Sequence, residues 1–277
     1  TVIKPKIVSS FDDPRVDAYR NVTDADLRGR KHLFMVESEM VVSRLLSTRW
    51  NIHSVFLSPN KFERLSPLLA SCRAPIFVAD VNLMTEIVGF HIHRGALAAV
   101  HRPAKEVVSV ENQFNKLKTK EKVSLLLAER ITNVDNMGSL FRNAAAFGVD
   151  ALLFDNQCCD PLYRKSIRVS MGHSLTIPWA IAEDWTNTLR RLKSELGVTI
   201  IGCETGEHSQ PLWDVDGSNR MALVVGEEKA GLSTSTINLC DAIAEIPMQN
   251  GVPSINVAVA SAVVLYDFLR RDSFYKR

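Results

Sequence analysis

Short apolar stretches alternate with amphipathic ones along the first hundred residues. The predicted strands are 33–36, 52–57, 76–79 and 96–102, and the predicted helices are 39–46, 61–71 and 81–88. Such alternation with short connections predicts a small α/β layer structure. Residues 103–120 carry runs of charge and lack an apolar period, which indicates a linker or a weak surface helix.

The second half of the chain opens with a continuous apolar run at 123–128, which is typical of a strand covered on both faces. Further strands are predicted at 151–154, 176–181, 198–203, 222–225 and 242–246, separated mostly by helices. This pattern predicts a doubly wound parallel sheet, which binds ligands at the carboxyl ends of its strands. The predicted domains are 1–104 and 121–277, joined by a linker at 105–120.

The most unusual stretch is the apolar helix that ends near Arg270. It is apolar nearly all round, so it must be buried on a sheet or against another subunit. Ser254 stands at the predicted N-cap, after a loop rich in Pro, Asn and Gly. The plain interpretation of its two polar residues is a capped core helix, with Asn256 facing water in the first turn.

Two other strand ends carry polar groups. Asp135 or Asn136 can cap a helix that Gly148 ends, and Arg142 lies on the polar face of that helix. Arg142 is either a plain surface arginine or a group that contacts a phosphate or a reacting hydroxyl. The strand at 222–225 runs into a loop with glycines on both sides of an acidic pair, which permits close approach of a ligand to the backbone.

The composition of the chain excludes few classes of function. The chain has 277 residues with 33 Lys and Arg against 31 Asp and Glu, and this net charge of +2 makes no case for nucleic-acid binding. Local clusters such as residues 28–31 could contact phosphate or could be a solvated loop. The five cysteines show no C-x-x-C spacing and are odd in number, which indicates a reducing compartment and no structural zinc. His91 and His93 lack a third ligand, so we expect no metal site there either.

Membrane association is not expected. Residues 1–6 lack an apolar signal core, and the longest apolar run, 257–265, is about half of a membrane span. We expect a soluble cytoplasmic protein, with an organellar location after removal of a transit peptide as the alternative. The absence of G-x-G-x-x-G and of G-x-x-x-x-G-K-[ST] weakens the Rossmann dinucleotide and P-loop interpretations.

Three short motifs occur one after another in the second half of the chain. They are Asn-x-Gly-x-x-x-Arg (Asn136, Gly138, Arg142), Gly-x-Glu-x-x-Gly (Gly226, Glu228, Gly231) and Ile-Pro-Met followed by Ser-x-Asn-Val (Ile246 to Met248, Ser254 to Val257). Together they resemble the signature motifs of the SpoU, or TrmH-like, RNA ribose methyltransferases of the SPOUT class. The resemblance covers 123 to about 270, and 168–172 also looks like a family segment.

The resemblance implies a deep trefoil knot in the C-terminal domain and an obligate homodimer that buries the last helix. It implies S-adenosylmethionine as cofactor, with contacts that fall on Gly226, Ile246, Met248 and Ile255. The catalytic residues it implies are Asn136, Arg142, Glu228, Ser254 and Asn256, with Arg142 reaching the cofactor of the other subunit. The reaction it implies is methyl transfer to a ribose 2′-hydroxyl of RNA.

A general-base role for Arg142, proposed for this family, conflicts with the chemistry of a guanidinium group, which holds its proton strongly. We therefore favour Arg142 as an anchor of the target phosphate that polarises the hydroxyl, with deprotonation as the alternative. The sequence also departs from the family pattern, because Glu227 stands where a small or neutral residue is usual, Pro253 precedes the serine, and Ala258 replaces a frequent serine. The loop length from Met248 to Ser254 is kept, so we expect the cofactor site to survive.

The N-terminal domain resembles the ribosomal-protein-like RNA-binding module of many such enzymes, around residues 34–38 and 93–95. This module favours ribosomal RNA over transfer RNA as the substrate. The alternatives are a transfer RNA enzyme of the same class and a non-catalytic RNA-binding or ribosome-assembly factor. A doubly wound hydrolase is disfavoured because the chain lacks a G-x-S-x-G elbow.

Overall fold

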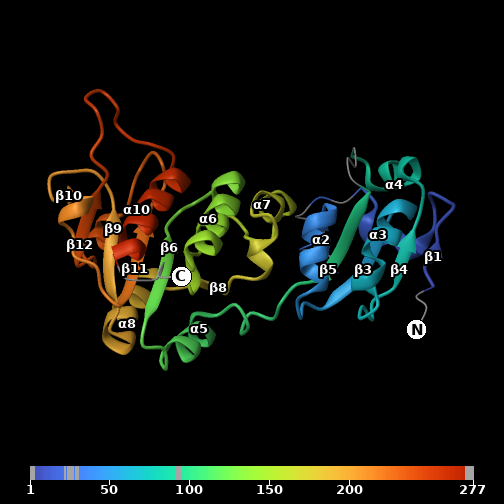
Figure 1. The fold of residues 1–277 in the computed structure, drawn as a ribbon, viewed down its shortest axis with the longest axis horizontal. Helices are drawn as coiled ribbons and strands as arrows, with labels where there is room; N and C mark the ends of the chain where they lie inside the picture. The colour runs from blue at the N-terminus through green and yellow to red at the C-terminus, as the bar shows by residue number, and fades with distance from the viewer. Residues whose placement is uncertain (1–3, 22, 24–27, 29–30, 91–94, 272–277) are drawn as a thin grey trace. The chain divides into compact units, whose positions relative to one another are not determined.

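The computed structural model describes residues 4–21, 23, 28, 31–90 and 95–271. The chain divides into two compact units, one of residues 1–103 with 161–176 and one of residues 104–160 with 177–277 (Figure 1). No described helix is long and apolar enough to cross a bilayer.

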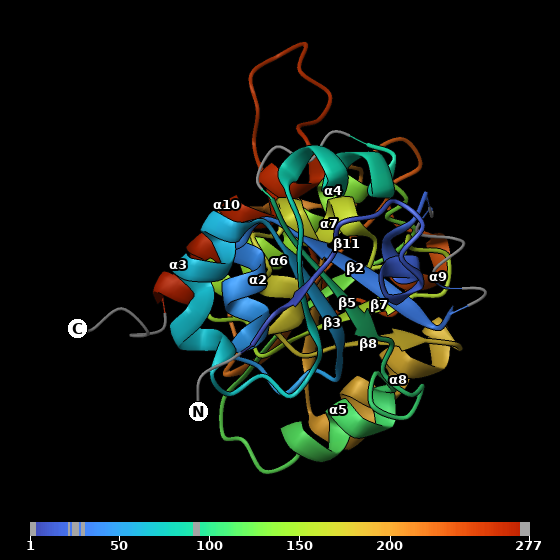
Figure 2. The ribbon, with the colours of Figure 1, turned by 90° about the vertical axis from the view of Figure 1, so that its right-hand side faces the viewer.

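The first unit is built on a five-stranded sheet in the order β1-β4-β3-β5-β2. Its elements are β1 (Lys6–Ile7), the 3-10 helix η1 (Pro14–Tyr19), β2 (Leu33–Glu37), α2 (Glu39–Leu46), β3 (Ile52–Leu57), α3 (Pro59–Leu69), β4 (Ile76–Val78), α4 (Val81–Val88) and β5 (Ala96–His101). Strand β5 is antiparallel to both of its neighbours, and the other pairs are parallel. Helices α2 and α3 lie side by side (Figure 2). The predicted α/β layer structure is confirmed for this unit.

The chain returns to the first unit between β7 and β8, through α7 (Arg164–Val169) and the 3-10 helix η3 (His173–Leu175). Arg164 and Arg168 each place a side-chain nitrogen 3.6 Å from an Oε2 atom of Glu37, at the end of β2. The indole of Trp50 donates to the carbonyl of Leu175 across 2.8 Å. These polar contacts attach the segment to the sheet and to the residues after α2.

The second unit is built on a fully parallel seven-stranded sheet in the order β10-β12-β9-β11-β6-β7-β8. Its elements are α5 (Val110–Leu117), β6 (Val123–Ala128), α6 (Val134–Phe147), β7 (Ala151–Asp155), β8 (Trp179–Ala182), α8 (Trp185–Leu196), β9 (Thr199–Cys203), β10 (Gln210–Pro211), the 3-10 helix η4 (Leu212–Asp214), β11 (Arg220–Val225), α9 (Thr234–Ile237), β12 (Ala242–Glu245) and α10 (Val257–Arg271). Strand β6 is buried at every residue, as its continuous apolar run predicts. The predicted parallel sheet is confirmed.

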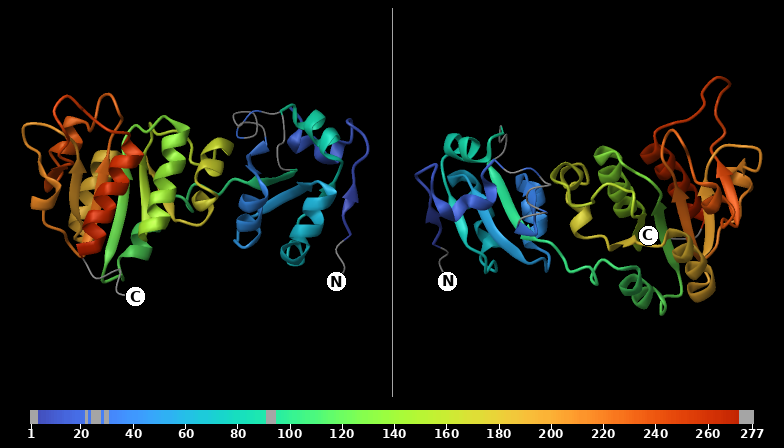
Figure 3. Two further views of the ribbon diagram at one scale, coloured as in Figure 1. Left: turned by 45° about the horizontal axis from the view of Figure 1, so that its top comes forward. Right: turned by 180° about the vertical axis from the view of Figure 1, so that it is seen from behind.

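Helices α6 and α10 lie side by side in this unit (Figure 3). The side-chain amide of Asn143 in α6 donates to the carbonyl of Ala258 at 2.6 Å and to the hydroxyl of Ser261 at 2.9 Å. Because Ser261 is fully buried, these bonds supply the partners that its polar group needs. Helix α6, which contains the first motif, and helix α10, which follows the third, are therefore joined by polar as well as aromatic contacts.

Two local predictions, both of helix N-caps, are wrong. The N-cap of α6 is Asn133, which accepts from the backbone of Asp135 and Asn136 at 2.8 and 3.1 Å. The N-cap role at α10 belongs to Asn256, whose Oδ1 accepts from Ala258 and Val259 at 2.9 and 3.3 Å, and not to Ser254. In both cases a side-chain oxygen two or three residues from the free amides has the reach that capping requires.

Residues 103–120, for which a linker or a weak surface helix is predicted, contain the helix α5, and one face of this helix is buried. Val110, Phe114 and Leu117 follow the i, i+4, i+7 spacing of one helix face, and Phe114 is fully buried. Phe114 and Leu117 belong to the core of the second unit. Charged residues between these three apolar positions conceal the period in the sequence.

Candidate active site

The three motif loops meet at one edge of the second sheet. They follow β6, β11 and β12, which are parallel strands, so their carboxyl ends point to the same edge. The first loop leads into α6, the second forms a tight turn, and the third leads into α10. Polar residues that lie far apart in the sequence are thereby brought together.

Asn136, Glu228 and Asn256, one from each motif, form a closed hydrogen-bonded group. Both amides donate to Oε1 of Glu228 at 2.9 Å, and the amide of Asn256 also donates to Oδ1 of Asn136 at 2.9 Å. Asn136 is buried, with 7% of its surface exposed, whereas Glu228 and Asn256 are exposed. Three of the five predicted catalytic residues are therefore in mutual contact.

Arg142 and Ser254 stand apart from this group. Arg142 is exposed on α6, and Ser254 is exposed in the loop before α10. Among the described residues, neither has a hydrogen bond or ion pair with Asn136, Glu228 or Asn256. Both side chains are thus available to a substrate.

The predicted cofactor contacts lie along the second and third loops. Gly226 follows β11, Ile246 and Met248 are half-buried after β12, and Ile255 is exposed at 37%. A Cβ at Gly226 would lie 2.5 Å from the carbonyl carbon and oxygen of Gly231. Glycine is required here because the two ends of the turn approach each other too closely for any side chain.

Gly231 is restricted in two ways. Its φ of +65° lies in the left-handed region, and a Cβ there would meet Oε2 of Glu204 at 2.0 Å. Its backbone N–H donates to the carbonyl of Glu227 at 2.8 Å and closes the turn. Residues 226–231, called here the 226–231 turn, are therefore a compact loop that only this pattern of glycines permits.

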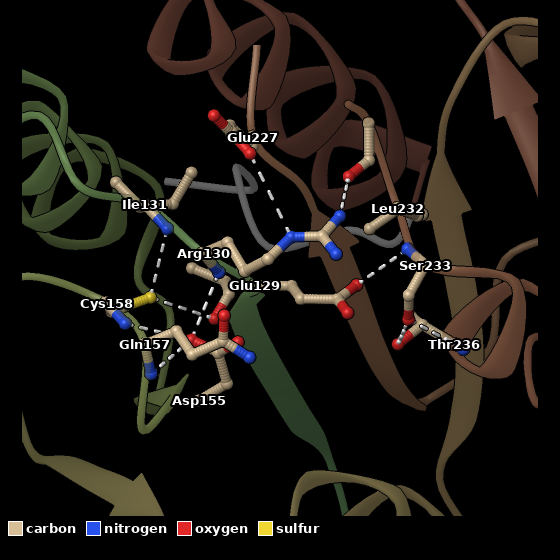
Figure 4. Close-up of polar contacts among 12 residues, drawn as sticks. Glu129, Arg130, Ile131, Asp155, Gln157, Cys158, Glu227, Leu232, Ser233 and Thr236 are labelled. Atoms are coloured by element: carbon tan, nitrogen blue, oxygen red, sulfur yellow. Dashed lines mark hydrogen bonds and ion pairs between the residues drawn. The ribbon is translucent and has the colours of Figure 1, made fainter. Parts of the chain in front are cut away.

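Residues that the sequence motifs did not reveal hold this turn and the residues after it (Figure 4). Arg130 donates from Nη2 to the carbonyl of Gly231 at 2.8 Å. Glu204 accepts from the backbone of Leu232 at 2.8 Å, and Glu129 accepts from the backbone of Ser233 at 3.1 Å. Each of the three is a charged residue within two positions of the end of a buried strand, and this position is the signal that could have identified them.

The neighbouring loop after β7 supports the same strand end. Oδ1 of Asp155 accepts from the backbone of Arg130 at 3.0 Å and of Cys158 at 3.0 Å. The thiol of Cys158 donates to the carbonyl of Ala128 at 3.3 Å and accepts from the backbone of Ile131 at 3.2 Å. Burial raises the pKa of Cys158, so this thiol is a structural donor and not a nucleophile.

A metal centre is not found in the part of the chain that the structure describes, where no group of three or more His, Cys, Asp or Glu side chains could hold an ion. His91 and His93 lie outside the described residues.

Comparison with known proteins decides the family. The model of the SpoU rRNA Methylase family matches residues 123–266, which include all three motifs and the Asn136, Glu228 and Asn256 group. The chain belongs to this family. The resemblance of the three motifs is thus confirmed.

Two relatives of this SpoU family member match most of its length. It is 36% identical, over 94% of its residues and 90% of the other chain, to an uncharacterized tRNA/rRNA methyltransferase of Mycobacterium tuberculosis strain H37Rv. It is 30% identical to the 23S rRNA (guanosine-2′-O-)-methyltransferase RlmB of Pasteurella multocida, over 76% of this chain and 85% of that one.

Solved structures share the fold. An AdoMet-bound rRNA methyltransferase from Sinorhizobium meliloti superimposes with a TM-score of 0.81 at 21% identity, covering 96% of this chain and 98% of that one. The SpoU methyltransferase AviRb from Streptomyces viridochromogenes, in complex with AdoMet, gives a TM-score of 0.80 at 21% identity, with 94% and 98% coverage. At these identities the likeness concerns the fold of this SpoU family member.

Proposed function

We propose that this protein is an S-adenosylmethionine-dependent methyltransferase that modifies a ribose 2′-hydroxyl of ribosomal RNA. The observation that carries the proposal is the hydrogen-bonded group of Asn136, Glu228 and Asn256, which unites the three motifs. The name of the relative from Pasteurella multocida, a ribosomal RNA 2′-O-methyltransferase, supports the choice of reaction and substrate. The two solved structures with bound AdoMet support the choice of cofactor.

The residues present fit that cofactor. A 226–231 turn without side chains at either end leaves backbone groups open to a ligand, and Ile246 and Met248, in the loop after β12, supply half-buried apolar surface. We assign Gly226, Ile246, Met248 and Ile255 to cofactor binding. S-adenosylmethionine, when bound, supplies an electrophilic methyl group on a sulfonium centre. The protein then has to orient the ribose hydroxyl and to favour loss of its proton.

Arg142 and Ser254 are the groups we assign to the RNA. Both are exposed and not engaged by the Asn136, Glu228 and Asn256 group, so they can contact a substrate without breaking that group. Arg142 anchors the target phosphate through its planar guanidinium and polarises the hydroxyl. Asn136, Glu228 and Asn256 hold the three loops in register.

We further propose that the protein acts as a homodimer. Helix α10 exposes Val259 at 53%, Val263 at 39% and Tyr266 at 54%, and a contiguous apolar face of this kind marks an interface between proteins. Coverage by a second copy explains why the helix is apolar nearly all round. In such a dimer Arg142 serves the cofactor site of the partner, and the C-terminal part of the chain forms a deep trefoil knot.

The first unit is assigned to RNA binding, and the second unit to catalysis.

Transfer RNA is a second candidate substrate, because the Mycobacterium tuberculosis relative is named a tRNA/rRNA methyltransferase. The same site would then modify a ribose of transfer RNA.

Incubation with radiolabelled S-adenosylmethionine and unmodified ribosomal or transfer RNA tests the proposal. Label in alkali-resistant dinucleotides of ribosomal RNA alone is the expected result, because a 2′-O-methyl group blocks alkaline cleavage. Resistant label only in transfer RNA would replace the substrate. Absence of label from both RNAs and from isolated ribosomal subunits would favour a non-catalytic RNA-binding or ribosome-assembly factor.

A further inference from the structure

Arg130 has a backbone conformation that suits glycine better than arginine. Its φ is +56°, in the left-handed region that L side chains rarely adopt. The fold fixes this conformation, because the backbone N–H of Arg130 donates to Oδ1 of the buried Asp155 at 3.0 Å. A glycine would meet the backbone requirement without strain, so the side chain of Arg130 is the feature that requires an explanation.

That side chain reaches the 226–231 turn. Its Nη2 atom donates to the carbonyl of Gly231 at 2.8 Å, 101 positions along the chain (Figure 4). Gly231 closes the turn through its hydrogen bond to Glu227, and the two residues also form an antiparallel bridge. Arg130 therefore fixes the residue at which the turn closes.

The same guanidinium has a second N–H directed at the turn. The Nε atom of Arg130 is buried and has no hydrogen-bond acceptor among the described residues. Oε2 of Glu227 lies 4.0 Å from it, beyond hydrogen-bonding distance. A buried N–H of a charged group without an acceptor is unfavourable, so a small movement of the half-exposed Glu227 side chain would satisfy both groups.

The two adjacent glutamates of the turn are held by different elements. Glu228 accepts the amides of Asn136 and Asn256, from α6 and from the cap of α10. Glu227 faces Arg130, from the end of β6. Glu227 is also a departure from the family pattern, and Arg130 is the cation that compensates its charge.

We propose that Arg130 and Glu227 are positioning residues for the methyl donor, which fix the backbone of the 226–231 turn in the geometry that binds S-adenosylmethionine. The identity of the ligand rests on the proposed function, whereas the restraint on the turn does not. The pair touches no reacting atom in this scheme. It acts through the carbonyl of Gly231 and the closure of the turn.

The test uses Arg130→Gly, Arg130→Lys, Glu227→Gln and the double variant Arg130→Gly with Glu227→Gln, all in the full-length protein. Calorimetry with S-adenosylhomocysteine, which binds without reacting, gives the dissociation constant. We expect Arg130→Gly to weaken binding about tenfold, Arg130→Lys and Glu227→Gln to weaken it less, and the double variant to match Arg130→Gly. Arg190→Ala removes an exposed arginine of α8 and serves as the control that binds as the wild type does.

Two further readouts separate positioning from general destabilisation. The melting temperature of Arg130→Gly should stay within a few degrees of wild type, because glycine relieves the left-handed strain while the hydrogen bond to Gly231 is lost. Hydrogen exchange without ligand should be faster at the amides of 227–232 and unchanged in β6 and β11.

Unchanged affinity together with unchanged exchange in Arg130→Gly would overturn the proposal. So would affinity losses that track the melting temperature, or losses in the two single variants that simply add in the double variant. If the wild-type protein binds neither S-adenosylmethionine nor S-adenosylhomocysteine, the proposed function fails. In that case the hydrogen exchange of the 227–232 amides, compared between Arg130→Gly and the wild type, still tests whether Arg130 restrains the turn.

Discussion

Asn256 donates its side-chain amide to Oδ1 of Asn136 across 2.9 Å, although 120 positions separate the two residues. The Oδ1 atom of the same Asn256 caps α10 by accepting from the backbone of Ala258 and Val259. One side chain therefore uses its donor to join the first and third motifs and its acceptor to begin the helix.

Substitution of Asn256 should separate its two tasks. Asn256→Ala removes the cap and the amide bonds, and we expect it to lower the free energy of unfolding by about 2 kcal/mol. Asn256→Ser retains a capping oxygen and should cost about half as much. Urea denaturation at one protein concentration, followed by circular dichroism, measures both. Equal losses in the two variants would show that the cap contributes nothing.

Gly226→Ala should abolish the shape of the 226–231 turn. The new Cβ would lie 2.5 Å from the carbonyl carbon and oxygen of Gly231, so the turn must open. We expect binding of S-adenosylhomocysteine, measured by calorimetry, to weaken by more than about tenfold, or at least about 1.4 kcal/mol. Gly217→Ala is the matched control, because its Cβ would make only an ordinary contact of 3.6 Å with Phe268.

Arg142→Ala should lose methyl transfer and keep cofactor binding, because we assign Arg142 to the RNA. We expect kcat to fall at least about a hundredfold, the usual scale for loss of a positioned polar group, while the dissociation constant of the cofactor stays within about twofold. Arg142→Lys keeps the charge without the planar fork and should recover part of the RNA affinity. A matching loss of cofactor affinity in Arg142→Ala would contradict the assignment.

The exposed face of α10 provides a test of the dimer. Val259→Glu places a charge on this face, where Val259 is 53% exposed, and should convert a dimer to a monomer in light scattering after gel filtration. Val107→Glu is the matched control, since Val107 is exposed to 54% outside α10 and should leave the mass unchanged. A monomeric wild-type protein would remove the dimer from the proposal.

Two half-buried thiols, of Cys203 and Cys240, lead us to expect a loss of stability in alkali. Burial raises the pKa of Cys203 and of Cys240 to about 12, above the ordinary value of 9.0. Both thiols stay protonated in the folded protein while those of the unfolded chain ionise. The stability is therefore undiminished below pH 9 and falls as the pH rises from 9 toward 12, by about 1.4 kcal/mol for each thiol at pH 10. Urea midpoints between pH 8 and pH 10 should fall, and they should fall less in Cys203→Ala with Cys240→Ala.

The sequence by itself determined most of the strands of this protein, and the two that were not predicted, β1 and β10, have two residues each. The strand at 123–128 was predicted with its observed bounds, because a continuous apolar run leaves no other way to bury its side chains. Gly148, which ends α6 with a φ of +73°, could also be predicted, since glycine adopts that conformation without a steric cost. These features depend on neighbours within a few residues.

The motif residues Asn136, Glu228 and Asn256 were identified in the sequence, but only the tertiary structure decided that they bond to one another and that Asn256 caps its helix. Arg130 and Glu204 were missed altogether, because their partners Gly231 and Leu232 lie 101 and 28 positions away. The order of the strands in the parallel sheet decides which loops meet at its edge. A side chain binds whichever donor or acceptor that order brings within about 3 Å, and separation along the chain carries no information about this distance.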